Sequence, residues 1–395
     1  MTEHAEALGL SAAQLRRGGA EWTAREIAQQ PRVWPEILAR TGGDAALHEF
    51  LAPLLTNTAR RLVLTGAGTS SFIGECLAPA LLRGGRLARA VPSTDIVTSP
   101  ASTLLPNEPT LMVHFARSGN SPESLAALDL ATERIPDCAH LIVTCNADGD
   151  LYRRGRALRR AHALLLPESC NDQGFAMTSS FTGMLLAAAV ALRVAAPDNA
   201  RIAHLAALAS QLLTDGLPLL TALVRTGFER AVFLGSNELK GLAHEAALKI
   251  LELSDGRVVS LGESPLGFRH GPKTVVNAGT LIVLFLSNAD HARRYEIDLL
   301  NELRRDAVAA RVIALSHRAD LPAHPDTHIV NAAAPAGGYN APTDLELILP
   351  YVVFAQSLAV LRSLSLGVTP DSPNAAGTVS RVVQGVSIYP APPVS

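Results

Sequence analysis

Short apolar runs recur along most of the chain and alternate with amphipathic stretches. The runs are about six residues long and rich in Val, Leu and Ile, as in Arg61–Gly66 and Thr110–Phe115. Runs that are apolar on both faces are typical of strands buried inside a parallel sheet. Strands that alternate with helices require right-handed crossovers, so the pattern predicts an α/β fold with a doubly wound sheet.

The stretches between the runs have the spacing of helices. Examples are Ser121–Arg134 and Asp290–Val308. In the second stretch, apolar residues recur near helical spacing with charged residues between them, which predicts a buried face made of Tyr295, Leu299, Leu303 and Val308.

The same unit occurs twice in the chain. Three apolar runs recur in order at offsets of 169, 170 and 171 residues: Arg61–Gly66 with Arg230–Gly235, Thr110–Phe115 with Thr280–Phe285, and His140–Val143 with Arg311–Ala314. The repeat predicts two tandem doubly wound domains, at residues 45–200 and 215–365. Residues 1–44 would form a helical N-terminal arm and residues 366–395 a C-terminal tail, and either could act as an arm between subunits or as a lid.

Composition narrows the function classes. With 48% hydrophobic and 18% charged residues, the chain can bury a large core. A net charge of −2 and only 4% aromatic residues disfavour nucleic-acid binding. The longest apolar run, Met184–Leu192, is about half of a membrane span. The four cysteines form no C-x-x-C pair, so we expect reduced thiols in a cytoplasmic protein. From the charge, the aromatic content and the length of the apolar runs, we expect neither nucleic-acid nor membrane partners.

Polar loops follow two of the predicted strands. The loop Gly66–Ser71 offers Gly68, Thr69 and Ser70 where a helix begins. It lacks the third glycine of the dinucleotide fingerprint and the lysine of a Walker loop. Because helix N-termini attract anions and ligands sit beyond the carboxyl ends of parallel strands, this loop either binds an anion or caps its helix.

The second loop, Ala116–Ser121, has the same two interpretations. Its polar groups are those of Arg117, Ser118, Asn120 and Ser121. Two such loops after strands of one sheet favour a phosphate site. A third polar segment, Asn171–Thr182, contains Thr178 and Ser179, which either contact a ligand or cap the helix that follows.

Two segments of the second copy carry candidate acid–base groups. Within Gly241–Glu252, helical spacing puts Glu245, Lys249 and Glu252 on one face. That face is either a solvated ion-pair surface or a base, Glu252, kept ionised by Lys249. In Glu263–Lys273, His270 is either a proton shuttle or a structural histidine. No cluster has metal-ligand spacing, so we expect no metal and no cofactor.

Together these motifs resemble the sugar isomerase (SIS) domain family. The G-x-G-T-S and S-G-N-S loops match its phosphosugar-binding loops, and E-A-A-L-K-I-L-E with R-H-G-P-K matches the isomerase half of glucosamine-6-phosphate synthase. The segments N-D-Q-G-F-A-M-T-S-S-F-T and E-S-P-L-G-F-R-H-G-P-K resemble the branch of tagatose-6-phosphate ketose/aldose isomerases and galactosamine-6-phosphate deaminases.

The resemblance implies a role for each motif residue. Ser118, Asn120 and Ser121 would hold the sugar phosphate, and Thr69 and Ser70 would contact the sugar or the phosphate. Glu252 would move a proton between C1 and C2, with Lys249 assisting beside it. His270 would assist ring opening from a partner subunit, which implies a homodimer or a larger homo-oligomer.

The chain also departs from the synthase. Ala116 and Arg117 replace Ser-Gln in the phosphate loop, and Gly377 stands where the synthase has a lysine. No glutaminase domain is expected, so amination from glutamine is excluded. We therefore expect a deaminase/isomerase that releases ammonia from a 2-amino-2-deoxyhexose 6-phosphate, with galactosamine 6-phosphate as the substrate implied by the resemblance. The alternatives are a phosphosugar isomerase, a fructosamine-type deglycase and a non-enzymatic phosphosugar-sensing regulator.

Overall fold

A computed structural model describes residues 6–331, 340–383 and 385–391. The chain divides into two compact units. Unit 1 comprises Met1–Arg32, Gln173–Thr178 and Asn199–Ala375, and unit 2 comprises Val33–Asp172, Ser179–Asp198 and Ala376–Ser395. Near the N-terminus, helices α1 (Ala12–Gly18) and α2 (Glu21–Gly42) precede the first strand, as expected of a helical N-terminal region.

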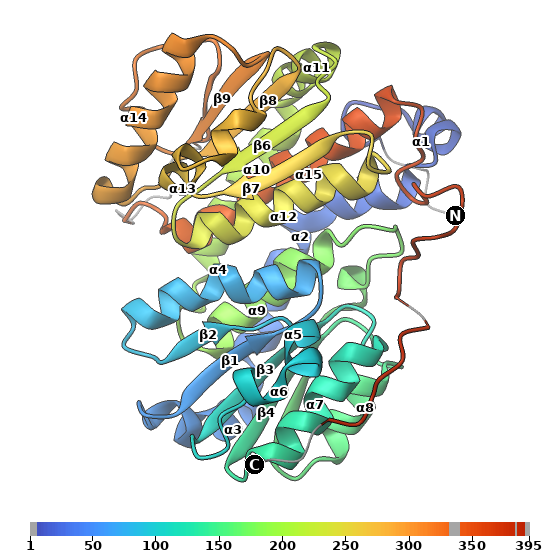
Figure 1. Ribbon diagram of the computed structural model, residues 1–395, viewed down its shortest axis with the longest axis vertical. Helices are drawn as coiled ribbons and strands as arrows, with labels where there is room; N and C mark the ends of the chain where they lie inside the picture. Colours follow the sequence, from blue (N-terminus) through green and yellow to red (C-terminus); the bar gives the residue numbers. More distant parts are fainter. Residues whose placement is uncertain (1–5, 332–339, 384, 392–395) are drawn as a thin grey trace. The chain divides into compact units, whose positions relative to one another are not determined.

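Unit 2 is built on a five-stranded parallel sheet with the order β2-β1-β3-β4-β5. Helices α3, α4 and α9 pack together on one face of the sheet, and α7 covers the other face, where core residues such as Val63 and Met112 contact Ala127 (Figure 1). The strands are β1 (Arg61–Thr65), β2 (Ala88–Ala90), β3 (Thr110–Ala116), β4 (Cys138–Thr144) and β5 (Ala161–Leu165). The helices are α3 (Ala45–Thr56), α4 (Thr69–Arg83), α5 (Ser93–Thr98), α6 (Pro100–Thr103), α7 (Pro122–Arg134), α8 (Asp150–Ala157), η1 (Glu168–Cys170) and α9 (Ser179–Ala191).

Unit 1 repeats this arrangement with the sheet order β10-β9-β8-β6-β7. Alternate side chains of the strands pack against α13 and α14 on one face, whereas Phe233 and Phe285 stack toward Tyr351 of α15 on the other. The strands are β6 (Arg230–Leu234), β7 (Val259–Glu263), β8 (Thr280–Phe285), β9 (Arg311–Ser316) and β10 (Thr327–Ile329). The helices are α10 (Asn199–Thr214), α11 (Leu217–Arg225), α12 (Glu238–Leu253), α13 (Pro265–Arg269), η2 (Pro272–Val275), α14 (Asp290–Asp306) and α15 (Asp344–Ser365).

The two sheets have the same topology, which confirms the predicted fold class of tandem doubly wound domains. Counted within each unit, both strand orders are 2-1-3-4-5, the flavodoxin-like order. The register also repeats, because Arg61 pairs with Thr110 in one unit and Arg230 with Thr280 in the other.

The third repeat match is wrong by one residue. Leu111 pairs with Ala139, whereas its counterpart Leu281 pairs with Arg311, so the structure aligns Ala139 rather than His140 with Arg311. A shift of one residue exchanges the two faces of a strand, and sequence similarity between runs that are apolar on both faces does not detect it.

The predicted buried face of α14 is partly wrong. Leu299 and Leu303 are buried, but Tyr295 is 42% exposed and Val308 is 50% exposed. Arg293 and Glu296 are buried in their place. Both have internal polar partners, Asp320 for Arg293 and the backbone N–H of Ser287 for Glu296, which compensates for their burial.

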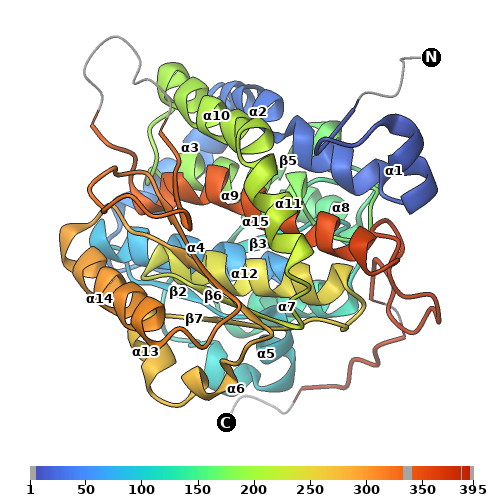
Figure 2. The same cartoon turned by 90° about the horizontal axis from the view of Figure 1, so that it is seen from above.

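Helix α15 is long and apolar enough to cross a membrane, yet 89% of its most apolar 18-residue stretch is buried inside the protein. It packs against α12 and α10, and α12 and α15 run side by side in both views (Figures 1 and 2). It is therefore the central helix of the core of unit 1.

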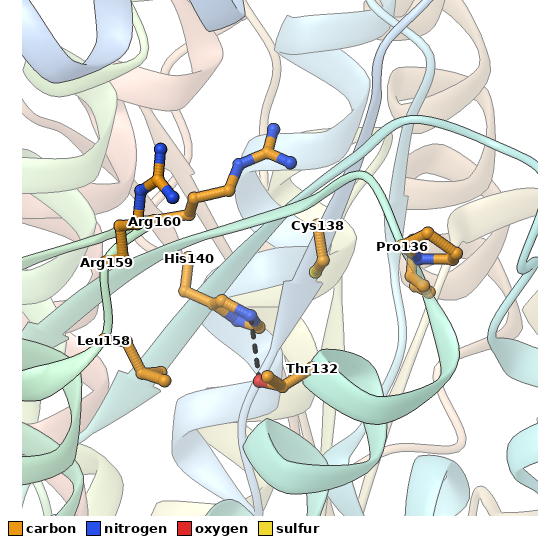
Figure 3. A pocket seen from close by; sticks show the side chains of 8 residues that line it. Thr132, Pro136, Cys138, His140, Leu158, Arg159 and Arg160 are labelled. Atoms are coloured by element: carbon orange, nitrogen blue, oxygen red, sulfur yellow. Dashed lines mark hydrogen bonds between the residues drawn. The ribbon is translucent and has the colours of Figure 1, made fainter.

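Two buried histidines, His114 on β3 and His140 on β4, lie side by side on neighbouring strands of the unit 2 sheet. Thr132 donates its hydroxyl to the carbonyl of Leu128 at 2.8 Å, so its oxygen accepts from Nε2 of His140 at 3.1 Å (Figure 3). Nδ1 of His140 then accepts from Nε2 of His114 at 3.1 Å. Both rings are neutral in this arrangement, and a proton added to Nδ1 of His140 would meet the N–H of His114 unless that ring changed its tautomer.

His140 also lines a pocket of about 650 Å³ near the amino ends of β4 and β5. The carboxyl ends, which bind ligands in doubly wound sheets, lie at the opposite edge of the sheet. Burial, with a smaller contribution from Arg160, lowers the pKa of His140 to about 4, and burial also lowers the pKa of His114 well below its ordinary value.

We expect acid to destabilise the protein through His140. His140 binds a proton below about pH 6.5 in the unfolded chain but only below about pH 4 in the folded chain. The stability that is present above pH 6.5 is therefore lost as the pH falls from about 6.5 to about 4. His140→Gln should reduce the loss between about pH 7.5 and about pH 5 by roughly 2 kcal/mol, measured by urea unfolding. The matched control His291→Gln, at an exposed ring, should keep the wild-type pH slope. Equal slopes in all three proteins would contradict the assignment.

Candidate functional site

A tight turn leads from β1 into α4 in unit 2. A Cβ on Gly66 would lie 2.6 Å from Cβ of Ser70, so no larger residue fits there. Gly68 adopts φ 54° and is the N-cap of α4, without a side-chain capping bond. The side chains of Thr69 and Ser70 are buried, and Ser71 donates its hydroxyl to the carbonyl of Gly68 at 2.7 Å. The backbone of this turn therefore approaches α4 closely and leaves Gly68 exposed.

The loop between β3 and α7 is held from one side. The side-chain amide of Asn146 donates to the carbonyl of Ser118 at 2.8 Å, and the N–H of Leu151 donates to the carbonyl of Gly119 at 2.9 Å. Asn146 follows β4, the neighbouring strand. Asn146 was not predicted from the sequence, although its place two residues after a strand was an available signal.

The backbone N–H groups of Ser118 and Gly119 have no internal acceptor within residues 6–331, 340–383 and 385–391. Ser118 Oγ lies in the same loop and accepts from the N–H of Asn120 at 3.3 Å. Gly119 has φ 68°, and the loop leads directly into the N-terminus of α7. Unpaired amides at a helix N-terminus form a cradle for an anion.

Two predicted ligand residues of this loop have structural partners. Oδ1 of Asn120 accepts from the N–H of Asp150 at 2.9 Å, which caps α8. Oγ of Ser121 caps α7 and donates to Oγ of Ser124 at 2.7 Å. The capping interpretation therefore holds for these two side chains, and the amides of Ser118 and Gly119 remain available to a ligand.

The segment Asn171–Thr182 carries a capping carboxylate that the sequence analysis overlooked. Asp172 is fully buried and accepts from the N–H of Ser179 at 3.1 Å and from the N–H of Ser180 at 2.9 Å. The hydroxyl of Ser180 donates to the same carboxylate at 2.6 Å. Thr178 and Ser179 have side chains that are 0% and 2% exposed, so capping accounts for the start of α9.

Unit 1 has a turn of the same shape after β6. Gly235 and Asn237 occupy the positions of Gly66 and Gly68, and Asn237 adopts φ 51°. Residues 230–239 also repeat the burial pattern of residues 61–70. The copies differ at the next position, where the buried Glu238 replaces Thr69.

In unit 1, carboxylates fill the loop that corresponds to Ala116–Ser121. Glu296 accepts from the N–H of Ser287 at 2.7 Å, and Asp344 accepts from the N–H of Asn288 at 2.7 Å. Asp344 also accepts from the hydroxyl of Ser287. Burial raises the pKa of Glu296 to about 7. Asn288 and Ala289 correspond to Ser118 and Gly119, and the N–H of Ala289 donates to Oγ of Ser287 at 2.9 Å. Internal oxygens thus occupy the donors that unit 2 leaves open, so this loop has no comparable cradle.

Helix α12 of unit 1 carries the predicted acid–base residues. Lys249 is 1% exposed, and its Nζ lies 2.5 Å from Oε2 of Glu252 and 3.6 Å from Oε1 of Glu245. Glu245 is fully buried, whereas the side chain of Glu252 is 26% exposed. The interpretation as a solvated ion-pair face is wrong, because Glu245 and Lys249 are buried and only Glu252 is partly exposed.

His270 lies on a rigid loop of unit 1. Phe268 is fully buried, and Arg269 pairs with Asp298 at 3.0 Å and with Glu302 at 2.7 Å on α14. On the other side of His270, Lys273 pairs with Asp306 at 2.7 Å and also with Glu302. These contacts fix the loop and leave the His270 side chain exposed. Across the part of the chain that the structure describes, no group of three His, Cys, Asp or Glu residues is arranged to hold a metal ion.

The SIS domain family matches residues 55–193, which contain both open loops of unit 2. The chain is 43% identical to the D-galactosamine-6-phosphate deaminase AgaS of Escherichia coli, over 93% of this chain and 96% of that protein. It is 40% identical to the D-galactosamine-6-phosphate deaminase AgaS of Shewanella sp., over 98% of this chain and 97% of that protein.

Solved structures agree with these relatives. The Escherichia coli tagatose-6-phosphate ketose/aldose isomerase superposes with a TM-score of 0.84 at 40% identity, covering 93% of this chain and 96% of that chain. Thermotoga maritima glucosamine-6-phosphate deaminase shares the fold, with a TM-score of 0.63 at 20% identity over 88% of this chain and 98% of that chain. This chain belongs to the SIS domain family, in the branch that contains the AgaS galactosamine-6-phosphate deaminases and the tagatose-6-phosphate ketose/aldose isomerases.

Proposed function

We propose that this enzyme converts D-galactosamine 6-phosphate into tagatose 6-phosphate and ammonia. The activities named for its relatives support this substrate. The observation that carries the proposal is the pair of open backbone amides at Ser118 and Gly119, because a phosphate monoester is the part of such a substrate that needs fixed N–H donors.

The phosphate binds to the loop Ala116–Ser121. The amides of Ser118 and Gly119 donate to its oxygens, the hydroxyl of Ser118 adds a third donor, and the buried Arg117 supplies positive charge. The turn at Gly68, Thr69 and Ser70 contacts the sugar or the phosphate. Asn120 and Ser121 hold the loop in shape through the bonds by which they cap α8 and α7. Thr178 and Ser179 lie at the start of α9 and contribute to the shape of the binding site.

Glu252 is the base that moves the proton. In the open-chain aldehyde it removes the proton from C2, the new C1=C2 double bond forms, and the C1 oxygen takes up a proton, which gives an enolamine. Return of the proton to C1, with loss of a proton from the amino nitrogen, leaves an imine at C2. Water adds to that imine, ammonia leaves, and the ketose 6-phosphate remains. Lys249 keeps the carboxylate in place through the 2.5 Å ion pair and supplies positive charge beside it.

His270 assists ring opening from a neighbouring subunit of a homodimer. Its exposure on a loop fixed by ion pairs supports this assignment, because a rigid exposed imidazole can reach across an interface. A cytoplasmic location also belongs to this proposal, in keeping with four buried free cysteines.

An ammonia-release assay tests the proposed reaction. We expect ammonia and tagatose 6-phosphate from galactosamine 6-phosphate, and little or no ammonia from glucosamine 6-phosphate or N-acetylgalactosamine 6-phosphate. Activity should persist in EDTA. Interconversion of an aldose and a ketose phosphate without ammonia from any hexosamine 6-phosphate would establish the isomerase alternative instead.

Glu252→Gln should lower kcat by at least about 100-fold and leave substrate binding intact, because a positioned base contributes about 10²–10⁴-fold. The matched control Glu133→Gln, at an exposed carboxylate of α7, should keep wild-type kcat. Steady-state kinetics with ordinary and C2-deuterated substrate separate the proton transfer from other steps. A Glu252→Gln enzyme with near-normal turnover would remove Glu252 from the mechanism.

Ser118→Ala should raise KM about tenfold with little change in thermal stability, because it removes one hydroxyl donor from the phosphate. Ser121→Ala should lower the stability by about 1 kcal/mol, because Ser121 caps α7. Initial rates and thermal melts measure the two effects. A Ser118→Ala enzyme with unchanged KM would show that this hydroxyl does not touch the phosphate.

A further inference from the structure

The C-terminal tail makes a two-sided contact within unit 2 through Arg381. The carbonyl oxygen of Arg381 accepts from Nη2 of Arg117 at 2.7 Å. The guanidinium of Arg381 donates to the backbone carbonyl of Asp172. The sequence predicted only an arm or a lid for this segment and gave no role to Arg381.

Both partners of Arg381 belong to structures that surround the proposed phosphate loop. Arg117 is the first residue after β3 and is 6% exposed. Asp172 precedes α9 and caps it through the N–H groups of Ser179 and Ser180. Arg381 therefore joins the start of the phosphate loop to the start of α9.

Polar contacts, not burial of apolar surface, hold this part of the tail. Val379 and Val383, on either side of Arg381, are 58% and 53% exposed, so they gain little from the hydrophobic effect. The described residues of the tail from 376 onward form no helix or strand, as the dark red trace in Figure 1 shows. The two bonds of Arg381 thus anchor this part of the tail.

We propose that Arg381 is a positioning residue for the phosphate of the substrate. Its carbonyl fixes one edge of the Arg117 guanidinium, and its own guanidinium keeps that carbonyl in place by binding Asp172. The ligand is a phosphate monoester dianion, whose charge and paired oxygens suit a planar guanidinium of fixed orientation. This assignment rests on the proposed function, because it takes the loop after β3 as the phosphate site.

Arg381→Ala, Arg117→Ala and the double variant test the proposal. Each single variant should raise KM for galactosamine 6-phosphate about tenfold and change kcat less than about twofold, since the contact serves binding rather than proton transfer. The double variant should be no worse than Arg117→Ala, because both changes disable the same guanidinium. Val383→Ala, at an exposed residue of the same tail, is the matched control and should match the wild type.

Calorimetric titration with inorganic phosphate gives a readout that does not need turnover. Arg381→Ala should weaken phosphate binding about tenfold, and deletion of Thr378–Ser395 should reproduce the loss. Wild-type phosphate affinity and KM in Arg381→Ala, a loss in kcat at unchanged KM, or additive effects in the double variant would each overturn the proposal. If the wild type binds phosphate but releases no ammonia from any hexosamine 6-phosphate, the proposed function fails while the calorimetry still decides the role of Arg381.

Discussion

The structure depends on how backbone N–H groups are satisfied at the carboxyl edge of a parallel sheet. Each strand there gives way to a helix whose first amides have no partner within the helix. In unit 1 the amide of Asn288 donates to Asp344, and the amide of Ala289 donates to Oγ of Ser287. In unit 2 the corresponding loop leaves the amides of Ser118 and Gly119 without an internal acceptor among the described residues. One fold, used twice, therefore gives one filled edge and one that is open to an anion.

Buried charged side chains in α12 hold Glu252 in place. Burying Glu245 and Lys249 costs desolvation free energy, which their mutual contact at 3.6 Å and the bond from Lys249 to Glu252 at 2.5 Å offset. Three charged side chains on one helical face thus form one unit, in which only Glu252 reaches solvent. A carboxylate held in this way keeps little rotamer freedom, whereas a carboxylate in a solvated ion pair would keep more.

The core strands and the duplication could be predicted from the sequence, because short runs that are apolar on both faces are typical of strands in a buried parallel sheet. Helical spacing also located α7 and α14 to within two residues at each end. Prediction failed where distant polar partners decide the outcome. The sequence of α14 cannot show that Glu296 is buried, because its partner Ser287 is fixed only by tertiary structure. The sequence also could not show that Oδ1 of Asn120 accepts from the N–H of Asp150, because that partner lies 30 residues away and comes close only once β3 and β4 pair.

Shape and chemistry are separable in the two copies. Gly66 and Gly235 admit no side chain, and Gly68 and Asn237 share a positive φ, so the turn after the first strand of each unit keeps one geometry. Asparagine is among the residues that tolerate such a backbone, which is why unit 1 can do without glycine there. With the turn fixed, the next side chain decides the character of the edge: a hydroxyl in unit 2 is compatible with a bound anion, whereas the buried carboxylate of Glu238 in unit 1 repels one.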